Sequence, residues 1–205
     1  MTNSSLKLAL IVLAGLMIGA AAALALFPQA RERLLPAGTT SAGRALVGGP
    51  FALTDQTGKR VTDKDFRGRY TLVFFGFTYC PDVCPSALQV VAGALDKLGA
   101  KGRQITPVFV TVDPERDSPA QLATYLKSFH PRLVGLTGSS ADIEAVTKAY
   151  RVYVKKVTDA KSSAGYSFDH SAIIYLMGPD GAYLTHFTHA TSVDAMAERL
   201  GKLLP

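Results

Sequence analysis

Apolar and polar residues alternate along the chain in blocks that predict an α/β domain. Residues 70–78, with the sequence YTLVFFGFT, form an almost continuous apolar run, which is typical of a strand buried on both faces of a sheet. Residues 105–112 form a second run of this kind. Between the two runs, residues 85–98 repeat apolar side chains at helical spacing, so we expect a helix that connects two buried strands.

The remaining blocks complete the predicted order of elements. Turn residues GPDG, at 178–181, predict a hairpin near the end of the chain. The other expected elements are two short strands within 50–63, helices at 118–129 and 139–152, hairpin strands at 171–177 and 182–187, and a helix at 192–204. This order predicts a mixed sheet flanked by helices, which is a thioredoxin-like fold with an inserted helix and an N-terminal hairpin.

The first 48 residues have a different pattern. Residues 8–27 contain no charged side chain, and a run of about 20 apolar residues is the length that a helix needs to cross a bilayer. We therefore predict a short tail at 1–7, a transmembrane anchor at 8–27, a Pro- and Gly-rich linker at 28–48 and a folded domain at 49–205. A cleaved signal peptide is the alternative to an anchor. We expect a single-pass protein of the bacterial inner membrane, with its C-terminal domain in the periplasm.

Composition narrows the possible partners. Apolar residues make up 48% of the chain and charged residues 19%, so a packed core is expected and global disorder is not. The formal net charge is +6, but the basic residues are scattered and do not interleave with aromatic residues in a run. This pattern argues against a nucleic-acid partner and favours attraction to an acidic protein surface or an anionic membrane.

Both cysteines of the chain lie at the expected junction between a strand and a helix, in TYCPDVCPSAL at 78–88. A helix N-terminus favours thiolate over thiol, so the pKa of Cys80 and Cys84 should fall. On one helix face their Cβ atoms would lie about 5–6 Å apart, which is wider than the roughly 3.5–4.5 Å of a disulfide. The spacing thus favours metal binding, while a redox couple, a structural disulfide and two simply buried thiols stay open. Asp82 is expected either to cap the helix or to tune the site.

His170 is the candidate for a third metal ligand. It lies in SFDHSAIIYLM, directly before an expected buried strand, where thioredoxins place a cis-proline opposite the cysteine helix. Two thiolates and one imidazole form a soft set of three ligands that favours Cu(I) and keeps Cu(II) accessible, whereas a closed zinc site usually has four ligands. Asp169 is expected either to orient His170 or to cap the turn.

For the other histidines and the segment at 111–119, the sequence indicates a role in the site less strongly. His130 is expected at a helix end on the surface. His186 and His189 are expected to be solvated, with a second metal site as the alternative. In the segment TVDPERDSP, the two aspartates, Asp113 and Asp117, are expected to cap the following helix, with Arg116 as their ionic partner.

Three segments together resemble the Sco/SenC family of copper proteins: FTYCPDVCPSAL at 77–88, TVDPERDSP at 111–119 and DHSAIIYLMGPDG at 169–181. The resemblance covers about residues 48–205. It implies a membrane-tethered, thioredoxin-like domain that binds one copper ion, Cu(I) or Cu(II), with Cys80, Cys84 and His170 as the ligands. The family is implicated in assembling the CuA site in subunit II of cytochrome c oxidase.

The resemblance leaves two functions open. The leading hypothesis is a metallochaperone, not an enzyme, that takes copper from an upstream periplasmic donor and passes it to the CuA domain of subunit II by ligand exchange. The alternative is a thiol–disulfide oxidoreductase that reduces the cysteines of the copper acceptor, with Cys80 as the attacking and Cys84 as the resolving thiol. A peroxidase of related fold fits less well, because the double-cysteine, double-proline motif departs from a peroxidatic site.

Overall fold

The computed structural model describes residue 7 and residues 12–15, 46–158 and 165–205. The chain divides into two compact units, residues 1–44 and 45–205. In the first unit, the described residues 12–15 are helical, and the rest of the predicted anchor at 8–27 lies outside the described residues, as does the linker up to residue 45. Among the helices that the structure describes, none has the length and apolar character needed to span a bilayer.

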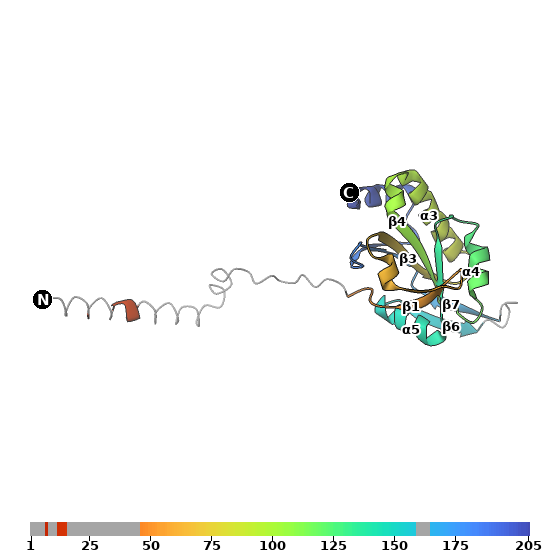
Figure 1. Cartoon of the computed structure of the whole chain (residues 1–205), viewed down its shortest axis with the longest axis horizontal. Helices are drawn as coiled ribbons and strands as arrows, with labels where there is room; N and C mark the ends of the chain where they lie inside the picture. The colour runs from red at the N-terminus through yellow and green to blue at the C-terminus, as the bar shows by residue number, and fades with distance from the viewer. Residues whose placement is uncertain (1–6, 8–11, 16–45, 159–164) are drawn as a thin grey trace. The chain divides into compact units, whose positions relative to one another are not determined.

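A seven-stranded mixed sheet forms the centre of the second unit (Figure 1). Its strands run in the order β2-β1-β5-β4-β3-β8-β9. They are β1 (Ala52–Asp55), β2 (Arg60–Thr62), β3 (Tyr70–Gly76), β4 (Ile105–Thr111), β5 (Val134–Thr137), β8 (Ile173–Met177) and β9 (Tyr183–Thr188). β3 pairs in parallel with β4, and β4 with β5, while the outer pairs are antiparallel. The predicted mixed sheet is therefore confirmed.

Helices pack around this sheet at the positions that the apolar spacing predicts. They are α3 (Val83–Leu98), α4 (Pro119–Leu126), α5 (Ser140–Ala149) and α6 (Val193–Leu203), with short 3-10 turns η1 (Asp63–Phe66) and η2 (Lys101–Gln104). α3 packs along α6, α4 packs on β5, and α5 contacts β1. The hydroxyls of Ser118, Ser139 and Ser192 accept the N-terminal amides of α4, α5 and α6, so each of these helices begins at a side-chain cap.

His170 lies at the end of one strand of a separate two-stranded sheet. β6 (Val154–Thr158) pairs antiparallel with β7 (Tyr166–His170), and Val154 lies opposite His170. The sequence analysis did not predict this pair, nor the short strand β5. The segment VKKVT has exposed lysines in its middle and too few apolar residues to mark a buried face, so its strand signal is weak.

The hydrophobic core surrounds the central strands β3 and β4. Phe74, Phe75 and Phe109 are at most 1% exposed, as expected for strands covered on both faces. Their rings and those of neighbouring tyrosines pack at tilted or edge-on angles. β3 runs from this core directly to the loop that carries Cys80.

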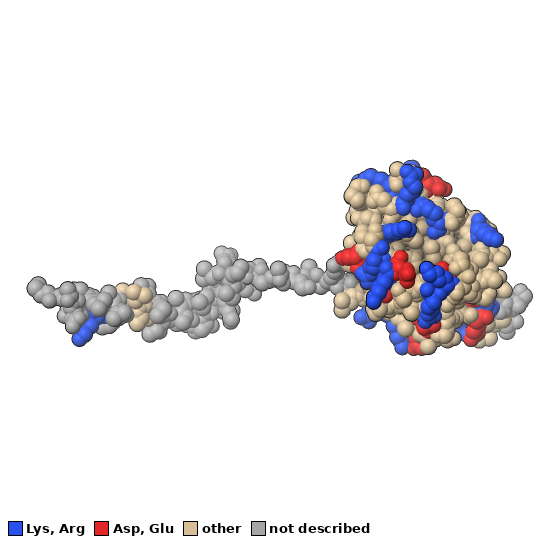
Figure 2. Space-filling model, viewed as in Figure 1, with Lys and Arg blue, Asp and Glu red and all other residues tan. Residues whose placement is uncertain are grey.

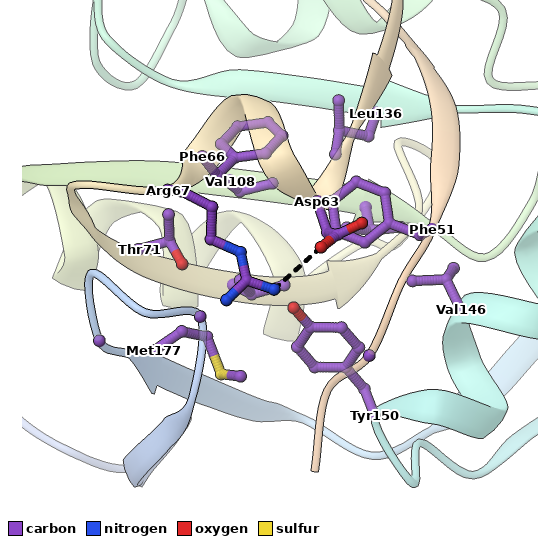
Figure 3. Close-up of a pocket in the computed structure, with 15 residues that line it drawn as sticks. Phe51, Asp63, Phe66, Arg67, Thr71, Val108, Leu136, Val146, Tyr150 and Met177 are labelled. Atoms are coloured by element: carbon purple, nitrogen blue, oxygen red, sulfur yellow. Dashed lines mark hydrogen bonds and ion pairs between the residues drawn. The ribbon is translucent and has the colours of Figure 1, made fainter.

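A closed cavity lies near the opposite end of β3 (Figure 3). An ion pair between Arg67 and Asp63, 2.9 Å long, closes one side of it, and Phe51, Tyr150 and Met177 line it. Burial raises the pKa of Tyr150 to about 12. The cavity has a volume of about 30 Å³, which is room for one or two waters only, and no cysteine or histidine lines it. It is therefore not a candidate for the metal site.

Basic and acidic side chains are interspersed on the face of the domain that Figure 2 shows. Several of the basic side chains have acidic partners, such as Arg60 with Asp142 at 3.2 Å and Lys97 with Asp194 at 2.7 Å. These pairs are exposed, so each contributes little to stability. Each pair nevertheless offsets one positive charge with one negative charge.

Candidate metal centre

Cys80 and Cys84 lie just beyond the C-terminal end of β3. Cys80 is in the loop, whereas Cys84 is the second residue of α3, which begins at Val83. The prediction that both sulfurs lie on one helical face is therefore wrong. Pro85, not Pro81, falls in the first turn of the helix, where a missing N–H costs nothing. The bend instead brings the Cys80 sulfur 3.4 Å from the backbone nitrogen of Cys84, which donates to it.

The two thiols differ in burial and in pKa. Both are free cysteines; Cys80 is half-buried and Cys84 is fully buried. A hydrogen bond from the Cys84 side chain, aided by backbone N–H groups, lowers the pKa of Cys80 to about 5. The same hydrogen bond, together with burial, raises the pKa of Cys84. In the metal-free protein these opposite shifts favour the thiolate at Cys80 and the thiol at Cys84.

Gly76 at the end of β3 makes room for the buried sulfur. A Cβ atom at this position would lie 2.7 Å from the Cys84 sulfur and 2.9 Å from the ring of Phe109. Contacts this short do not occur between real Cβ atoms and their neighbours, so any larger residue would displace the sulfur or the ring. The glycine is therefore part of the cysteine site.

His170 reaches the cysteines from the end of β7. Its Nε2 atom lies 3.8 Å from the Cys84 sulfur. Its ring packs edge-on against Phe77, and its Nδ1 atom faces the carbonyl oxygen of Phe168 at 3.5 Å. Asp169 is exposed and makes no hydrogen bond or ion pair among the described residues. The predicted role of Asp169 in orienting His170 is therefore not seen, and aromatic packing and a backbone carbonyl are the neighbours that hold the ring.

A cavity of about 350 Å³ opens in front of these side chains. Cys80, His170 and the exposed His189 line it, together with Phe77 and Phe168. Within the part of the chain that the structure describes, no group of three or more His, Cys, Asp or Glu side chains is arranged so that it could hold a metal ion. Two sulfurs, from the loop after β3 and from α3, and the imidazole at the end of β7 nevertheless lie next to one another, and this donor set suits a soft or borderline ion such as copper.

The sequence profile of the SCO1/SenC family matches residues 39–205. The chain belongs to the SCO1/SenC family. The sequence resemblance to this family is thereby confirmed, and its likeness to solved Sco structures confirms the thioredoxin-like α/β fold of the C-terminal unit.

Three relatives illustrate the match. The structure of Bradyrhizobium japonicum ScoI with copper bound is 46% identical, with a TM-score of 0.70 over 76% of this chain and 98% of that one. The copper-bound ScoI of Arabidopsis thaliana is 43% identical, with a TM-score of 0.72 over 76% and 96%. The human mitochondrial SCO1 homolog is 45% identical over 71% of this chain and 48% of its own length. The chain spans about half the length of the first curated relatives that it matches.

Asp117, in the segment TVDPERDSP, anchors the loop that carries Cys80. This carboxylate is fully buried and accepts hydrogen bonds from the amide and hydroxyl of Thr78 and from the hydroxyl of Thr111, at 2.6–2.9 Å. Burial raises the pKa of Asp117 despite these bonds. The predicted role of Asp117 as a helix cap is wrong, because Ser118 caps α4. Asp117 instead fixes the loop two residues before Cys80.

Arg116 in the same segment joins the cysteine loop to the hairpin that carries His170. Its guanidinium lies over the ring of Tyr79, 4.6 Å from the centroid, and over the ring of Tyr166, 3.7 Å from the centroid. It forms the predicted ion pair with Asp113, which is buried and also accepts from the Tyr166 hydroxyl at 3.0 Å. Its Nη1 donates to the Tyr166 carbonyl at 3.2 Å. The sequence singled out Arg116 and Asp113, but gave no signal for Tyr79 or Tyr166.

Two further side chains differ from expectation. Asp82 occupies the N-cap position of α3, but its side chain accepts from the Ser86 hydroxyl at 3.3 Å and does not cap the backbone. His130 is buried, not at the surface, and its Nδ1 accepts from the amide of Arg132 at 3.1 Å. Neither residue lines the cavity next to Cys80.

Proposed function

We propose that this Sco protein binds one copper ion through Cys80, Cys84 and His170 and delivers it to a protein acceptor. The observation that carries the proposal is the approach of the His170 imidazole to within 3.8 Å of the Cys84 sulfur, beside a Cys80 thiolate. Two Sco proteins at 46% and 43% identity have been solved with copper bound, which supports copper as the metal. The ion is cargo in this account, and it is held only until an acceptor takes it.

The different burial of the ligands suits transfer by ligand exchange. Cys80 is already deprotonated and half-buried, so it binds copper without first losing a proton and remains within reach of an incoming acceptor thiolate. Cys84 is buried and must lose its proton when the metal binds. An acceptor thiolate that enters at the Cys80 side displaces the ligands one at a time, so the copper is never released into solution.

We further propose the CuA domain of cytochrome c oxidase subunit II as the acceptor, with an upstream periplasmic copper donor. A related protein with the same fold, BsSco, is a member of the Sco family of cytochrome c oxidase assembly proteins, and this supports the proposal. The uncharged segment at 8–27 supports attachment to the bacterial inner membrane, with the domain in the periplasm near a membrane-bound oxidase.

Copper binding is tested by competition with a Cu(I) chelator, using the reduced full-length chain. We expect one tight copper per chain, and His170→Ala should weaken it about 10-fold to 100-fold. His186→Ala is the matched control, since His186, like His170, lies on a β-strand but does not line the cavity. Equal affinity of the His170→Ala variant and the parent would contradict the three-ligand site. Transfer is then followed by mixing the Cu(I)-loaded chain with a reduced CuA-domain fragment, separating the two proteins and measuring the copper content of each.

Thiol–disulfide exchange is a second candidate function, and the contrast between the thiols favours it. The Cys80 thiolate attacks one sulfur of an acceptor disulfide and releases the other as a thiolate. Cys84, after losing its proton, attacks Cys80, so that the acceptor leaves fully reduced and a Cys80–Cys84 disulfide remains. In a Cys84→Ser variant the mixed disulfide with the acceptor should accumulate. Its absence, with copper binding intact in the parent, would leave delivery as the function.

A further inference from the structure

We propose that His189 is an additional copper donor at the mouth of the site, used for Cu(II) and not for Cu(I). This proposal rests on the proposed function, because it concerns the same copper ion. His189 lines the cavity that Cys80 and His170 line, and it is exposed to solvent where Cys84 is fully buried. His189 thus shares the cavity with two of the three proposed copper ligands, Cys80 and His170.

The sheet fixes the backbone of His189 beside the segment that leaves His170. Thr188 at the end of β9 lies opposite Ile173 at the start of β8. The pairing continues by one residue, since the amide of His189 donates to the carbonyl of Ala172 at 3.2 Å. Ala172 follows His170 by two residues and also lines the cavity. His189 therefore sits at the cavity because of strand register: it is the turn residue directly after β9, and one backbone hydrogen bond holds it beside Ala172.

The bonding of His189 differs from that of the other histidines outside the inner site. His186 bonds the Tyr183 hydroxyl at 2.7 Å, and His130 accepts from the amide of Arg132. The ring of His189 makes no hydrogen bond, ion pair or ring contact with any residue that the structure describes. Because its imidazole has no protein partner there, it can turn a ring nitrogen into the cavity without breaking an interaction. The alternative of a second metal site formed by His186 and His189 is not favoured, since of these two only His189 lines the cavity beside Cys80 and His170.

The coordination preferences of copper decide when this extra imidazole matters. Cu(I) is well satisfied by two thiolates and one further ligand, whereas Cu(II) prefers a tetragonal arrangement that includes nitrogen or oxygen donors. Three inner ligands leave Cu(II) one donor short of four. An imidazole at the cavity mouth supplies that donor, so His189 should stabilise the oxidised form of the bound ion selectively.

The experiment compares full-length parent, His189→Ala, His189→Gln and His186→Ala proteins loaded with Cu(II) or with Cu(I). We expect His189→Ala and His189→Gln to bind Cu(II) about 10-fold more weakly, and their electron paramagnetic resonance spectra to lose the coupling to one nitrogen. Their Cu(I) affinity should stay within twofold of the parent value. His186→Ala should leave the Cu(II) affinity, the electron paramagnetic resonance spectrum and the Cu(I) affinity unchanged. Because both residues are exposed on β9 or just after it, thermal unfolding should not separate the variants.

An unchanged Cu(II) spectrum and affinity in both His189 variants would overturn this proposal. A loss of Cu(I) and Cu(II) affinity by the same factor would also overturn it, because the donor would then not be selective. His170→Ala, measured alongside, keeps the two proposals apart. If His170→Ala loses copper while the His189 variants match the parent, only the additional donor is wrong. If His170→Ala binds copper as the parent does, the three-ligand site itself is wrong.

Discussion

The two halves of the site are held in place by different means. The sulfur half belongs to the main sheet and its first helix, where Cys84 and Asp117 are fully buried. The imidazole half belongs to the two-stranded β6–β7 sheet, which forms no ladder with the seven-stranded sheet among the described residues (Figure 1). His170 itself is partly exposed, and the residues around it on β7 are only partly buried.

This difference separates what folding determines from what a few local contacts determine. The thiols are positioned by core elements, because Cys84 lies on α3 and Cys80 lies in the short loop between β3 and α3. The His170 ring packs against Phe77, and Arg116, which stacks on Tyr79 and Tyr166, links strand β7 to the cysteine loop. Changes in the sulfur half should therefore cost stability, and changes in the imidazole half should cost copper affinity.

The largest effect is expected from Asp117→Ala. It leaves the amide and hydroxyl of Thr78 and the hydroxyl of Thr111 without their acceptor, and each such group costs about 1–3 kcal/mol when buried. The free energy of unfolding, measured by urea denaturation, should fall by about 3 kcal/mol. Asp117→Asn should cost less, because it keeps an acceptor and removes a charge that burial disfavours. The exposed neighbour Glu115→Ala is the control and should change stability by about 0.5 kcal/mol at most.

A smaller and different effect is expected from Arg116→Lys. The ammonium keeps a positive charge beside the buried Asp113 but cannot stack its plane on Tyr79 and Tyr166. Copper affinity should drop about 10-fold, while the free energy of unfolding falls by about 1 kcal/mol or less. Lys156→Ala is the matched control, because Lys156 also lies over the Tyr166 ring, at 3.8 Å, but in an exposed position. If Arg116→Lys destabilised the protein as much as Asp117→Ala, the contrast between the two halves would be lost.

A third test is the titration of Cys80 in the metal-free, reduced protein. Its pKa of about 5 lies below the ordinary value of 9.0, so its thiolate contributes stability that is present above pH 9 and is lost as the pH falls through 5. Alkylation by iodoacetamide, followed by mass spectrometry, should show a midpoint near pH 5 for Cys80 and no reaction of buried Cys84. Cys84→Ala removes the donor and should move the midpoint upward. A midpoint near 9 in the parent would show that the hydrogen bond between the thiols does not form.

The sequence predicted the parts of this molecule whose signals are local. The apolar run of β3, the helical spacing of α3 and the position of His170 before β8 were all correctly predicted, because burial on two faces or one leaves a periodic pattern. The hairpin β6–β7 was missed because its exposed lysines interrupt any such pattern.

The site was harder to predict wherever distant residues decide the outcome. Asp117 was expected at a helix cap, since nothing local shows that Thr78, 39 positions earlier, meets it. The stacking of Arg116 between Tyr79 and Tyr166 likewise joins segments that are far apart in sequence. The position of Cys80 outside the helix depends on the bend at Pro81 and Asp82, which the spacing of the cysteines alone does not reveal.

X-ray absorption at the copper edge tests the central claim most directly, because it counts the atoms bound to the metal. The Cu(I)-loaded full-length protein should show two sulfurs and one nitrogen, and His170→Ala should lose the nitrogen and keep both sulfurs. A parent spectrum with one sulfur or none, or a nitrogen that persists unchanged in His170→Ala, would contradict a site built from Cys80, Cys84 and His170.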